Sequence, residues 1–197
     1  MMKKWLALFM VAAVAAQAGD DMTSTGKTEL ATFGGGCFWC MEAVFEQIPG
    51  VAKVTSGYTG GHVKSPSYHD VTSGDTGHAE AIQIEFDPQV TSFDKLLDVF
   101  WDAHDPTQLN RQGNDVGEQY RSVIFYHSDE QKKTAQASKE KLAASGHYSK
   151  PIVTPIQAAD TFFPAEKYHQ EYYRNNRSQP YCQFVIRPKL EKLGLKP

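Results

Sequence analysis

The apolar residues of the chain recur with two different periods, one typical of strands and one typical of helices. Strict alternation over residues 80–86 places Ile82, Ile84 and Phe86 on one face, which predicts a strand with one buried face. A spacing of three or four residues predicts a helix over residues 37–48. Further strands are predicted over residues 29–33, 51–58, 122–126 and 152–157. Further helices are predicted from Ser92 onward and over residues 128–146 and 165–175.

The order of these elements indicates an α+β fold. The first six run β-α-β-β-α-β, and more helix and strand follow. This order predicts a ferredoxin-like two-layer sandwich with extra C-terminal elements. Two polar stretches, residues 58–77 and 104–117, are predicted as loops, and loops of this length are often functional. After Pro180 the pattern predicts no definite element.

The N-terminal residues differ from the rest of the chain. Two lysines precede a short apolar run over residues 5–16, which ends in Ala16-Gln17-Ala18, an order typical of a secretory signal peptide. The run is shorter than the roughly 20 apolar residues of a membrane span. We therefore expect a periplasmic or secreted protein with no membrane attachment after cleavage; an uncleaved anchor and a cytosolic N-terminus are the alternatives. The expected division is a signal peptide over residues 1–18, a tether over 19–27 and a single domain over 28–197.

Composition and charge exclude several classes of protein. With 197 residues, of which 41% are hydrophobic, the chain is long enough for one domain with a substantial core. The net charge of −3 argues against a protein that binds nucleic acid through its phosphates. Three cysteines are too few for a disulfide scaffold or an all-cysteine zinc site, and the seven histidines show no metal-binding spacing. We expect a monomer.

Cys37 is the first candidate for chemistry. Three glycines, residues 34–36, lead from a predicted strand into a helix that begins at or near Cys37. At this position the helix dipole and unpaired backbone N–H groups favour the thiolate, so we expect a lowered pKa and a nucleophilic sulfur. Phe38 and Trp39 follow directly, and we expect their rings to line a pocket beside the sulfur. The alternative is that Cys37 is a small buried residue after a turn.

Glu80 shares the face of its strand that buries Ile82. A carboxyl group at the edge of an apolar face is desolvated, so we expect a raised pKa and a role as general acid; the alternative is a side chain turned to solvent. Tyr68 and Tyr120 lie in or just after the two polar stretches, and their phenols could hold a substrate oxygen, although packing is the more common role of a tyrosine. Asp115 is by pattern a turn residue.

The other two cysteines are candidates for a disulfide with Cys37. Cys182 lies in a polar C-terminal stretch, and we expect a flexible tail that can carry it to Cys37. Cys40 lies three residues after Cys37 on the same helix face, so a disulfide between Cys37 and Cys40 is the alternative. The alternative for Cys182 is an inert thiol.

Six groups of motifs, spread over roughly residues 30–185, occur in the order in which one known family of enzymes carries them. They are Gly36-Cys37-Phe38-Trp39, Gly57-Tyr58, Pro66-Ser67-Tyr68, Thr76-Gly77-His78-Ala79-Glu80, the run from Asp105 through Asp115 to Ser122, and Tyr168-His169-Gln170. By these motifs the sequence is identified as a member of the peptide methionine sulfoxide reductases of the A type. The fold of that family agrees with the sandwich predicted above.

The resemblance implies an enzyme that reduces methionine S-sulfoxide in oxidised proteins and peptides. It implies that Cys37 attacks the sulfoxide sulfur and becomes a sulfenic acid. It implies Glu80 as the acid, and Tyr68 and Tyr120 as the two phenols that hold the sulfoxide oxygen. No metal or organic cofactor is implied.

The resemblance also assigns the substrate pocket and the recycling of the enzyme. Phe38 and Trp39 match an aromatic pocket for the substrate's methyl group, and Asp115 matches a pocket aspartate. Cys182 matches a resolving cysteine found in part of the family, with Cys40 as the alternative. The cysteine that many members carry four residues after the loop tyrosine is absent here. An external thioredoxin-type dithiol is the implied reductant.

Two other functions are open at the level of sequence. Cys37-x-x-Cys40 is a pattern of thiol–disulfide oxidoreductases, although Trp39 lies between the two cysteines rather than before them. The second alternative is a periplasmic binding module in which Cys37 is buried and inert.

Overall fold

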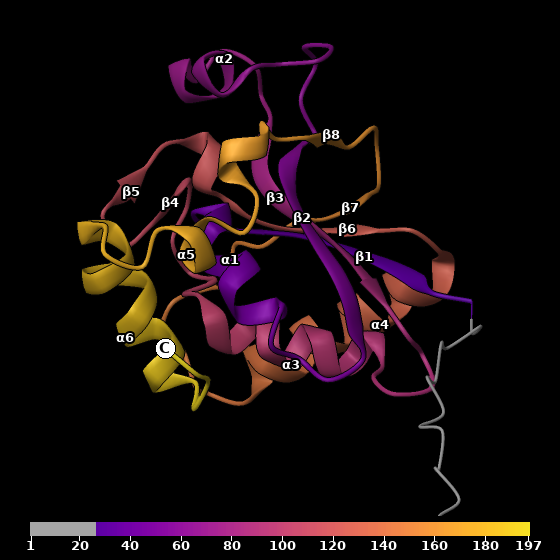
Figure 1. The fold of residues 1–197 in the computed structure, drawn as a ribbon. Helices are drawn as coiled ribbons and strands as arrows, with labels where there is room; N and C mark the ends of the chain where they lie inside the picture. The colour runs from indigo at the N-terminus through magenta and orange to yellow at the C-terminus, as the bar shows by residue number, and fades with distance from the viewer. Residues whose placement is uncertain (1–26) are drawn as a thin grey trace, which may run out of the picture.

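The computed structural model describes residues 27–197 (Figure 1). The expected signal peptide and almost all of the expected tether lie outside the described residues. Within the described part, none of the helices combines the length and the apolar character required to span a bilayer.

A six-stranded sheet forms the centre of the domain (Figure 1). Its strand order is β7-β6-β1-β3-β2-β8, and every neighbouring pair is antiparallel except β6 and β7, which are parallel. The strands are β1 (Glu29–Gly35), β2 (Val51–Thr59), β3 (Ala79–Phe86), β6 (Ser122–Tyr126), β7 (Ile156–Ala158) and β8 (Phe163–Pro164).

The four central strands confirm the predicted ferredoxin-like topology. Strand β3 lies between β1 and β2, and β1 lies between β3 and β6, so two β-α-β units interlock in one sheet. The helices α1 (Phe38–Phe45), α3 (Phe93–Ala103) and α4 (Asp129–Ala144) lie together below the sheet in Figure 1. The late strands β7 and β8 extend the two edges, as extra C-terminal elements.

The core between sheet and helices is dominated by phenylalanine. Phe33 of β1 stacks on Phe100 of α3 with ring centroids 4.9 Å apart and packs against Phe45 of α1 at 5.7 Å. Aromatic pairs at these separations stabilise a core beyond the burial of their surface. Ser92 caps α3 by accepting a hydrogen bond from the amide of Lys95, which is the cap that the sequence predicts.

Three predicted elements of the chain are wrong in extent. The helix that begins after Cys37 ends at Phe45 rather than at residue 48. The helix predicted over residues 165–175 is interrupted, because Glu171 has a left-handed backbone (φ 51°) that no α-helix continues through. In its place are a 3₁₀ turn, Lys167–His169, and the short α5, Tyr172–Asn175. The strand predicted over residues 152–157 is reduced to β7.

The two predicted loops contain short elements that the pattern does not reveal. In the first lies α2 (Tyr68–Ser73), whose N-terminus is closed by a capping box between Ser67 and Asp70. In and just after the second lie the hairpin of β4 (Arg111–Gln112) with β5 (Asp115–Val116) and a 3₁₀ turn, Glu118–Tyr120. The C-terminal stretch forms a π-helical turn (Cys182–Ile186) and α6 (Arg187–Lys192), which pack beside α1 (Figure 1).

Candidate active site

Cys37 lies where the chain leaves β1 and enters α1. Gly36 makes the turn with a left-handed backbone (φ 91°), and Cys37 is the N-cap residue of the helix. A side chain at position 36 would also meet Gln112, because a Cβ atom there would lie 2.7 Å from Gln112 atoms. Glycine is therefore required at this position both for the turn and for the close approach of the loop after α3. Cys37 is 8% exposed.

Glu80 lies at the start of β3, opposite Tyr58 of β2, and is 2% exposed. The structure confirms that its side chain shares the buried face. Its Oε2 accepts a hydrogen bond of 3.0 Å from the backbone amide of Phe38. Burial raises the pKa of Glu80 to about 8, and the charges of Asp115 and Cys40 act in the same direction, while the Phe38 amide opposes them. At neutral pH most of this carboxyl group is protonated, so it is a proton donor.

The expected lowering of the pKa of Cys37 is wrong for the substrate-free protein. Burial raises the pKa well above its usual value, and the neighbouring Cys40 and Glu80 raise it further; a hydrogen bond with Tyr181 only partly opposes this. The first amide of the helix, on Phe38, is taken by Glu80. Cys37 is therefore a thiol at rest.

Cys40 is the second thiol of this pair, and its pKa is lowered. Its hydrogen bond with Cys37 lowers the pKa to about 7 against the effect of burial, and the charge of Lys189 and the Tyr181 hydroxyl also lower it. The Sγ atom lies 3.7 Å from the Tyr181 hydroxyl. Near neutral pH a substantial fraction of Cys40 is thiolate, which makes it a good partner for disulfide chemistry.

Tyr68 and Tyr120 lie near the acid and the thiol, on different elements. Tyr68 begins α2, and Tyr120 ends the 3₁₀ turn before β6; both are half-buried. Burial and then the charge of Glu80 raise the pKa of Tyr68 to about 12, and the pKa of Tyr120 is raised by the same causes. The charge of Cys37 also acts on both phenols, so the structure brings all four groups together. Both phenols stay protonated and can donate a hydrogen bond.

Asp115 belongs to the hairpin of β4 and β5, and its side chain is more than a turn residue. Its Oδ2 accepts a hydrogen bond of 2.7 Å from the hydroxyl of Tyr181, which also approaches Cys40. These residues line a cavity of about 320 Å³ that contains Cys37 and Cys40, with Lys189 at its edge. Tyr181 is a site residue that the sequence pattern does not predict; its position directly before Cys182 is the one signal for it.

Phe38 and Trp39 are held in different ways. Phe38 is buried in the core, whereas Trp39 is half-buried and stacks on Tyr172 with ring centroids 3.6 Å apart and planes 6° apart. The Trp39 Nε1 donates a hydrogen bond of 3.0 Å to Nδ1 of His169. The His169 ring also lies 4.5 Å from that of Tyr68. His169 and Tyr172 therefore extend the aromatic surface formed by Phe38 and Trp39, which we call the aromatic wall. The motif around His169 is one of those that indicate the family, but no pattern in the sequence assigns a role to His169 or Tyr172.

Cys182 does not lie in a flexible tail, contrary to expectation. It is 0% exposed and belongs to the π-helical turn that packs against α1. The charge of Cys40 contributes to the raised pKa of Cys182, after burial, so the two sulfurs are electrostatic neighbours. Cys182 is therefore held inside an ordered turn, and π-helical turns are often found at functional sites.

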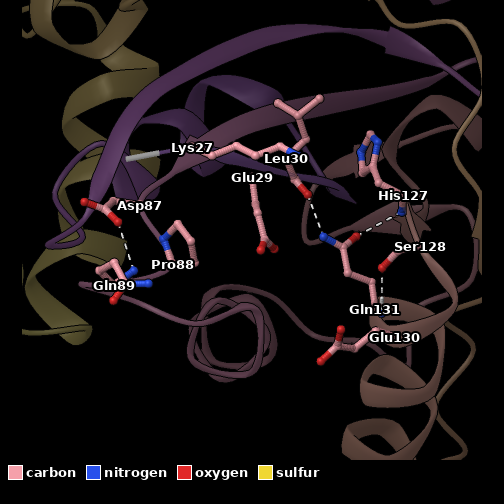
Figure 2. A pocket seen from close by; sticks show the side chains of 10 residues that line it. All are labelled: Lys27, Glu29, Leu30, Asp87, Pro88, Gln89, His127, Ser128, Glu130 and Gln131. Atoms are coloured by element: carbon pink, nitrogen blue, oxygen red, sulfur yellow. Dashed lines mark hydrogen bonds between the residues drawn. The ribbon is translucent and has the colours of Figure 1, made fainter. Parts of the chain in front are cut away.

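A second cavity lies at the other end of β1, away from the thiols (Figure 2). It measures about 540 Å³ and is lined by polar residues of β1, the turn after β3 and the start of α4. Several of these side chains already bond to the chain: the Gln131 amide donates to the Leu30 carbonyl and accepts from the His127 amide. None of the predicted site residues lies in it. Among residues 27–197 no group of histidine, cysteine and acidic side chains could hold a metal ion.

The fold and this site define an oxidoreductase built around buried cysteine thiols. A family model described as peptide methionine sulfoxide reductase matches residues 29–196. The chain belongs to this family, and it is a methionine sulfoxide reductase.

Individual relatives agree with this membership. The chain is 56% identical over 164 residues to the peptide methionine sulfoxide reductase MsrA of Leptospira borgpetersenii serovar Hardjo-bovis (strain L550), covering 83% of this chain and 92% of that protein. The reduced crystal structure of Mxr1 from Saccharomyces cerevisiae is similar with a TM-score of 0.75 and 34% identity, over 80% of this chain and 90% of the yeast chain. Mxr1 in complex with Trx2 matches with a TM-score of 0.54 and 26% identity, over 74% and 85% of the two chains.

Proposed function

We propose that the protein reduces the S epimer of methionine sulfoxide in oxidised proteins and peptides, with Cys37 as nucleophile and Glu80 as acid. One observation carries this assignment: the carboxyl of Glu80, largely protonated at neutral pH, is bonded to the amide of the residue that follows Cys37. A proton donor is thereby fixed beside the sulfur that must attack. The choice of the S epimer rests on family resemblance.

The first step transfers oxygen from one sulfur to another. Glu80 gives its proton to the sulfoxide oxygen, which Tyr68 and Tyr120 polarise through their hydroxyls, and the methionine sulfur becomes electrophilic. The sulfur of Cys37 attacks the methionine sulfur and forms an S–S bond, while the proton of the thiol passes to the Glu80 carboxylate. As this intermediate collapses, the hydroxyl moves from the methionine sulfur to the Cys37 sulfur and both the S–O and the S–S bonds to methionine break. The methionine sulfur regains its lone pair, methionine is released, and Cys37 is left as a sulfenic acid.

The substrate's methyl group would lie against the aromatic wall of Phe38 and Trp39. This wall is apolar and partly open, which suits a thioether methyl. Asp115 lies across the cavity that holds Cys37, where it can accept a hydrogen bond from the substrate or hold Tyr181 in place. The rest of an oxidised protein would lie outside the pocket.

Recycling proceeds through the other two cysteines. The sequence favours Cys182 as the partner of Cys37, and the burial of Cys182 favours Cys40 for the first condensation, because Cys40 is already hydrogen-bonded to Cys37 and is partly ionised. Condensation of the sulfenic acid with the Cys40 thiol releases water and forms the Cys37–Cys40 disulfide. Cys182 thiolate then attacks the Cys40 sulfur, which frees Cys37 and leaves a Cys40–Cys182 disulfide.

A thioredoxin-type dithiol would complete the cycle by reducing the final disulfide. The complex of the yeast relative with Trx2 supports this class of donor. A periplasmic or secreted location rests on the N-terminal sequence alone. In that location the donor would be a thioredoxin-like protein of the same compartment.

The test is to mix the reduced protein with one equivalent of a peptide that contains methionine S-sulfoxide, with the R epimer as control. Mass spectrometry should find reduced peptide only with the S epimer. The protein itself should lose two hydrogens and contain one disulfide that includes Cys40 or Cys182. Equal reduction of both epimers, or a reaction that survives Cys37→Ser, would contradict the proposal.

A further inference from the structure

Glu42 is a buried carboxyl group that the proposed reaction does not use. It lies on α1, one turn after Phe38, and is 1% exposed. Burial raises the pKa of Glu42 to about 7, and the charge of Glu46 acts in the same direction. Within residues 27–197 no cation pairs with Glu42, because Arg174 is bonded to Glu46 and Glu171. A carboxyl group is rarely buried in this way without a role.

The hydrogen bonds of Glu42 point to the segment that carries the aromatic wall. Its Oε2 accepts from the backbone amide of Tyr172 at 3.3 Å, and the backbone of Glu171 also lowers the pKa of the carboxyl. Oε1 has no hydrogen-bond partner of good geometry in the described part of the chain, and neither has the hydroxyl of Ser56, which also lowers the pKa of Glu42. Glu42 thus gives α1 a hydrogen bond to the backbone of the first residue of α5, in addition to the stack of Trp39 on the Tyr172 ring.

This contact holds a strained turn. Glu171 has a positive φ of 51°, which is unfavourable for a residue other than glycine and persists only where neighbours hold it. On one side of Glu171 lies His169, which accepts the hydrogen bond of Trp39. On the other lies Tyr172, whose ring stacks on Trp39. A shift of this turn would move both partners of Trp39.

We propose that Glu42 is a positioning residue for the substrate pocket: by holding the amide of Tyr172 it fixes the Tyr172 ring against Trp39 and so sets the affinity for the sulfoxide side chain. The proposal rests on the proposed role of Trp39 in substrate binding. Because Glu42 acts through Tyr172, its loss weakens binding and leaves the rate of the bound complex unchanged.

Three variants, each reduced with dithiothreitol that is removed before the assay, test this with a methionine S-sulfoxide peptide as substrate. Glu42→Leu removes the acceptor, Glu42→Gln keeps an acceptor oxygen of the same reach, and Glu46→Leu is the matched control one turn along α1. In single-turnover kinetics we expect Glu42→Leu to raise the half-saturating peptide concentration about tenfold, the effect of roughly one lost hydrogen bond, with the maximal rate within about twofold of wild type. Glu42→Gln and Glu46→Leu should saturate like the wild type.

Two further measurements separate positioning from a general loss of structure. Tyr172→Leu should raise the half-saturating concentration by itself, and adding Glu42→Leu to it should cause no further rise, because both remove one interaction. The near-ultraviolet circular dichroism of the stacked rings should weaken in Glu42→Leu and persist in Glu42→Gln.

The outcomes are distinguishable from a failure of the proposed function. Wild-type protein that reduces no sulfoxide would overturn the function, while the dichroism would still test the positioning. Three results would each overturn the role of Glu42. They are a half-saturating peptide concentration of Glu42→Leu equal to that of the wild type, additive effects of Glu42→Leu and Tyr172→Leu on this concentration, and a fall in the maximal rate alone. If Glu42→Leu does not fold, Glu42→Asp takes its place, because the shorter side chain withdraws the carboxyl from the Tyr172 amide. We expect Glu42→Asp to raise the half-saturating peptide concentration in the same way, and a wild-type value for this variant overturns the proposal.

Discussion

The backbone amide of Phe38 donates a hydrogen bond of 3.0 Å to the carboxyl of Glu80. That amide belongs to the first turn of α1, where sequence alone suggests that a thiolate of Cys37 would be stabilised. The helix terminus instead holds the acid. Both Cys37 and Glu80 favour their protonated forms in the substrate-free protein, so we expect the proposed nucleophile and the proposed proton donor to be activated together when a sulfoxide oxygen is available to accept the proton.

The position of Glu80 predicts the pH dependence of the first chemical step. In the proposed reaction the protonated form of Glu80 is the active one. Because burial raises the pKa of Glu80 to about 8, the single-turnover rate should fall as the pH rises through about 8. Glu80→Gln keeps an acceptor for the Phe38 amide and removes the proton. We expect a rate lower by roughly 10²–10⁴ and the loss of this alkaline decline.

Glu85→Gln is the control for this experiment. Glu85 lies on the same strand but pairs with Lys53 at the surface, 3.6 Å away. Its substitution should leave the rate and its pH profile unchanged. An alkaline decline that persists in Glu80→Gln would assign the titration to another group.

The placement of the three thiols predicts how many turnovers the enzyme makes without reductant. If the disulfide moves from the Cys37–Cys40 pair to Cys182, the wild type regains a free Cys37 and should release about two methionines per protein. Cys182→Ser should release about one and lose cycling with thioredoxin. Cys40→Ser should also release about one, with Cys37 left as a sulfenic acid that dimedone labels. A Cys37–Cys182 disulfide in Cys40→Ser, with no dimedone label on Cys37, would show that Cys182 reaches Cys37 directly.

The contact between Tyr181 and Cys40 predicts how the loss of the Tyr181 hydroxyl changes the pKa of Cys40. The hydrogen bond with Cys37 is the largest cause that lowers the pKa of Cys40 to about 7, and the Tyr181 hydroxyl, which lies 3.7 Å from the Cys40 sulfur, lowers it further. Tyr181→Phe keeps the ring, so the pKa of Cys40 should rise and its alkylation by iodoacetamide at pH 7 should slow severalfold. The measurement is made in a Cys37→Ser, Cys182→Ser background, compared with the same background carrying Tyr172→Phe. Equal alkylation rates in the two proteins would exclude a role for the Tyr181 hydroxyl.

Glu80 also predicts how stability changes with pH. Its pKa is about 8 in the folded chain and close to 4.5 when unfolded, so folding favours the protonated form. The contribution of protonated Glu80 to the free energy of unfolding is fully present below about pH 4.5 and is lost as the pH rises to about 8. Urea unfolding of Glu80→Gln should therefore show a weaker decrease of the free energy of unfolding between pH 5 and 8 than the wild type. An identical slope in the two proteins would mean that Glu80 is not desolvated.

The sequence predicts the central elements because their signals are local. Alternation in β3 and the Ser92 cap of α3 are read directly from neighbouring residues, and the buried Glu80 follows from the same alternation. The errors arise where distant contacts decide. Glu171 adopts a left-handed backbone beside Glu42 of another helix, and Cys182 is buried by packing against α1, neither of which a local pattern contains. The pKa of Cys37 depends on which group takes the Phe38 amide.

Gly36 offers a final test of how the turn positions Cys37. Gly36 and Gly74 have nearly the same left-handed backbone, with φ of 91° and 89°. A Cβ at position 36 would lie 2.7 Å from Gln112, whereas one at position 74 would meet no atom within 4 Å. Both alanine variants should lose about 1 kcal/mol of stability through the strained backbone.

The clash at position 36 should separate the two variants. Gly36→Ala must also displace Gln112 or the start of α1, so we expect a further loss of about 1 kcal/mol or more in urea unfolding and a single-turnover rate reduced at least about tenfold. Gly74→Ala lies at the end of α2 and should keep the wild-type rate. Equal rates in the two variants would mean that the position of Cys37 tolerates movement of the turn, and the role of Gly36 would then be limited to its backbone conformation.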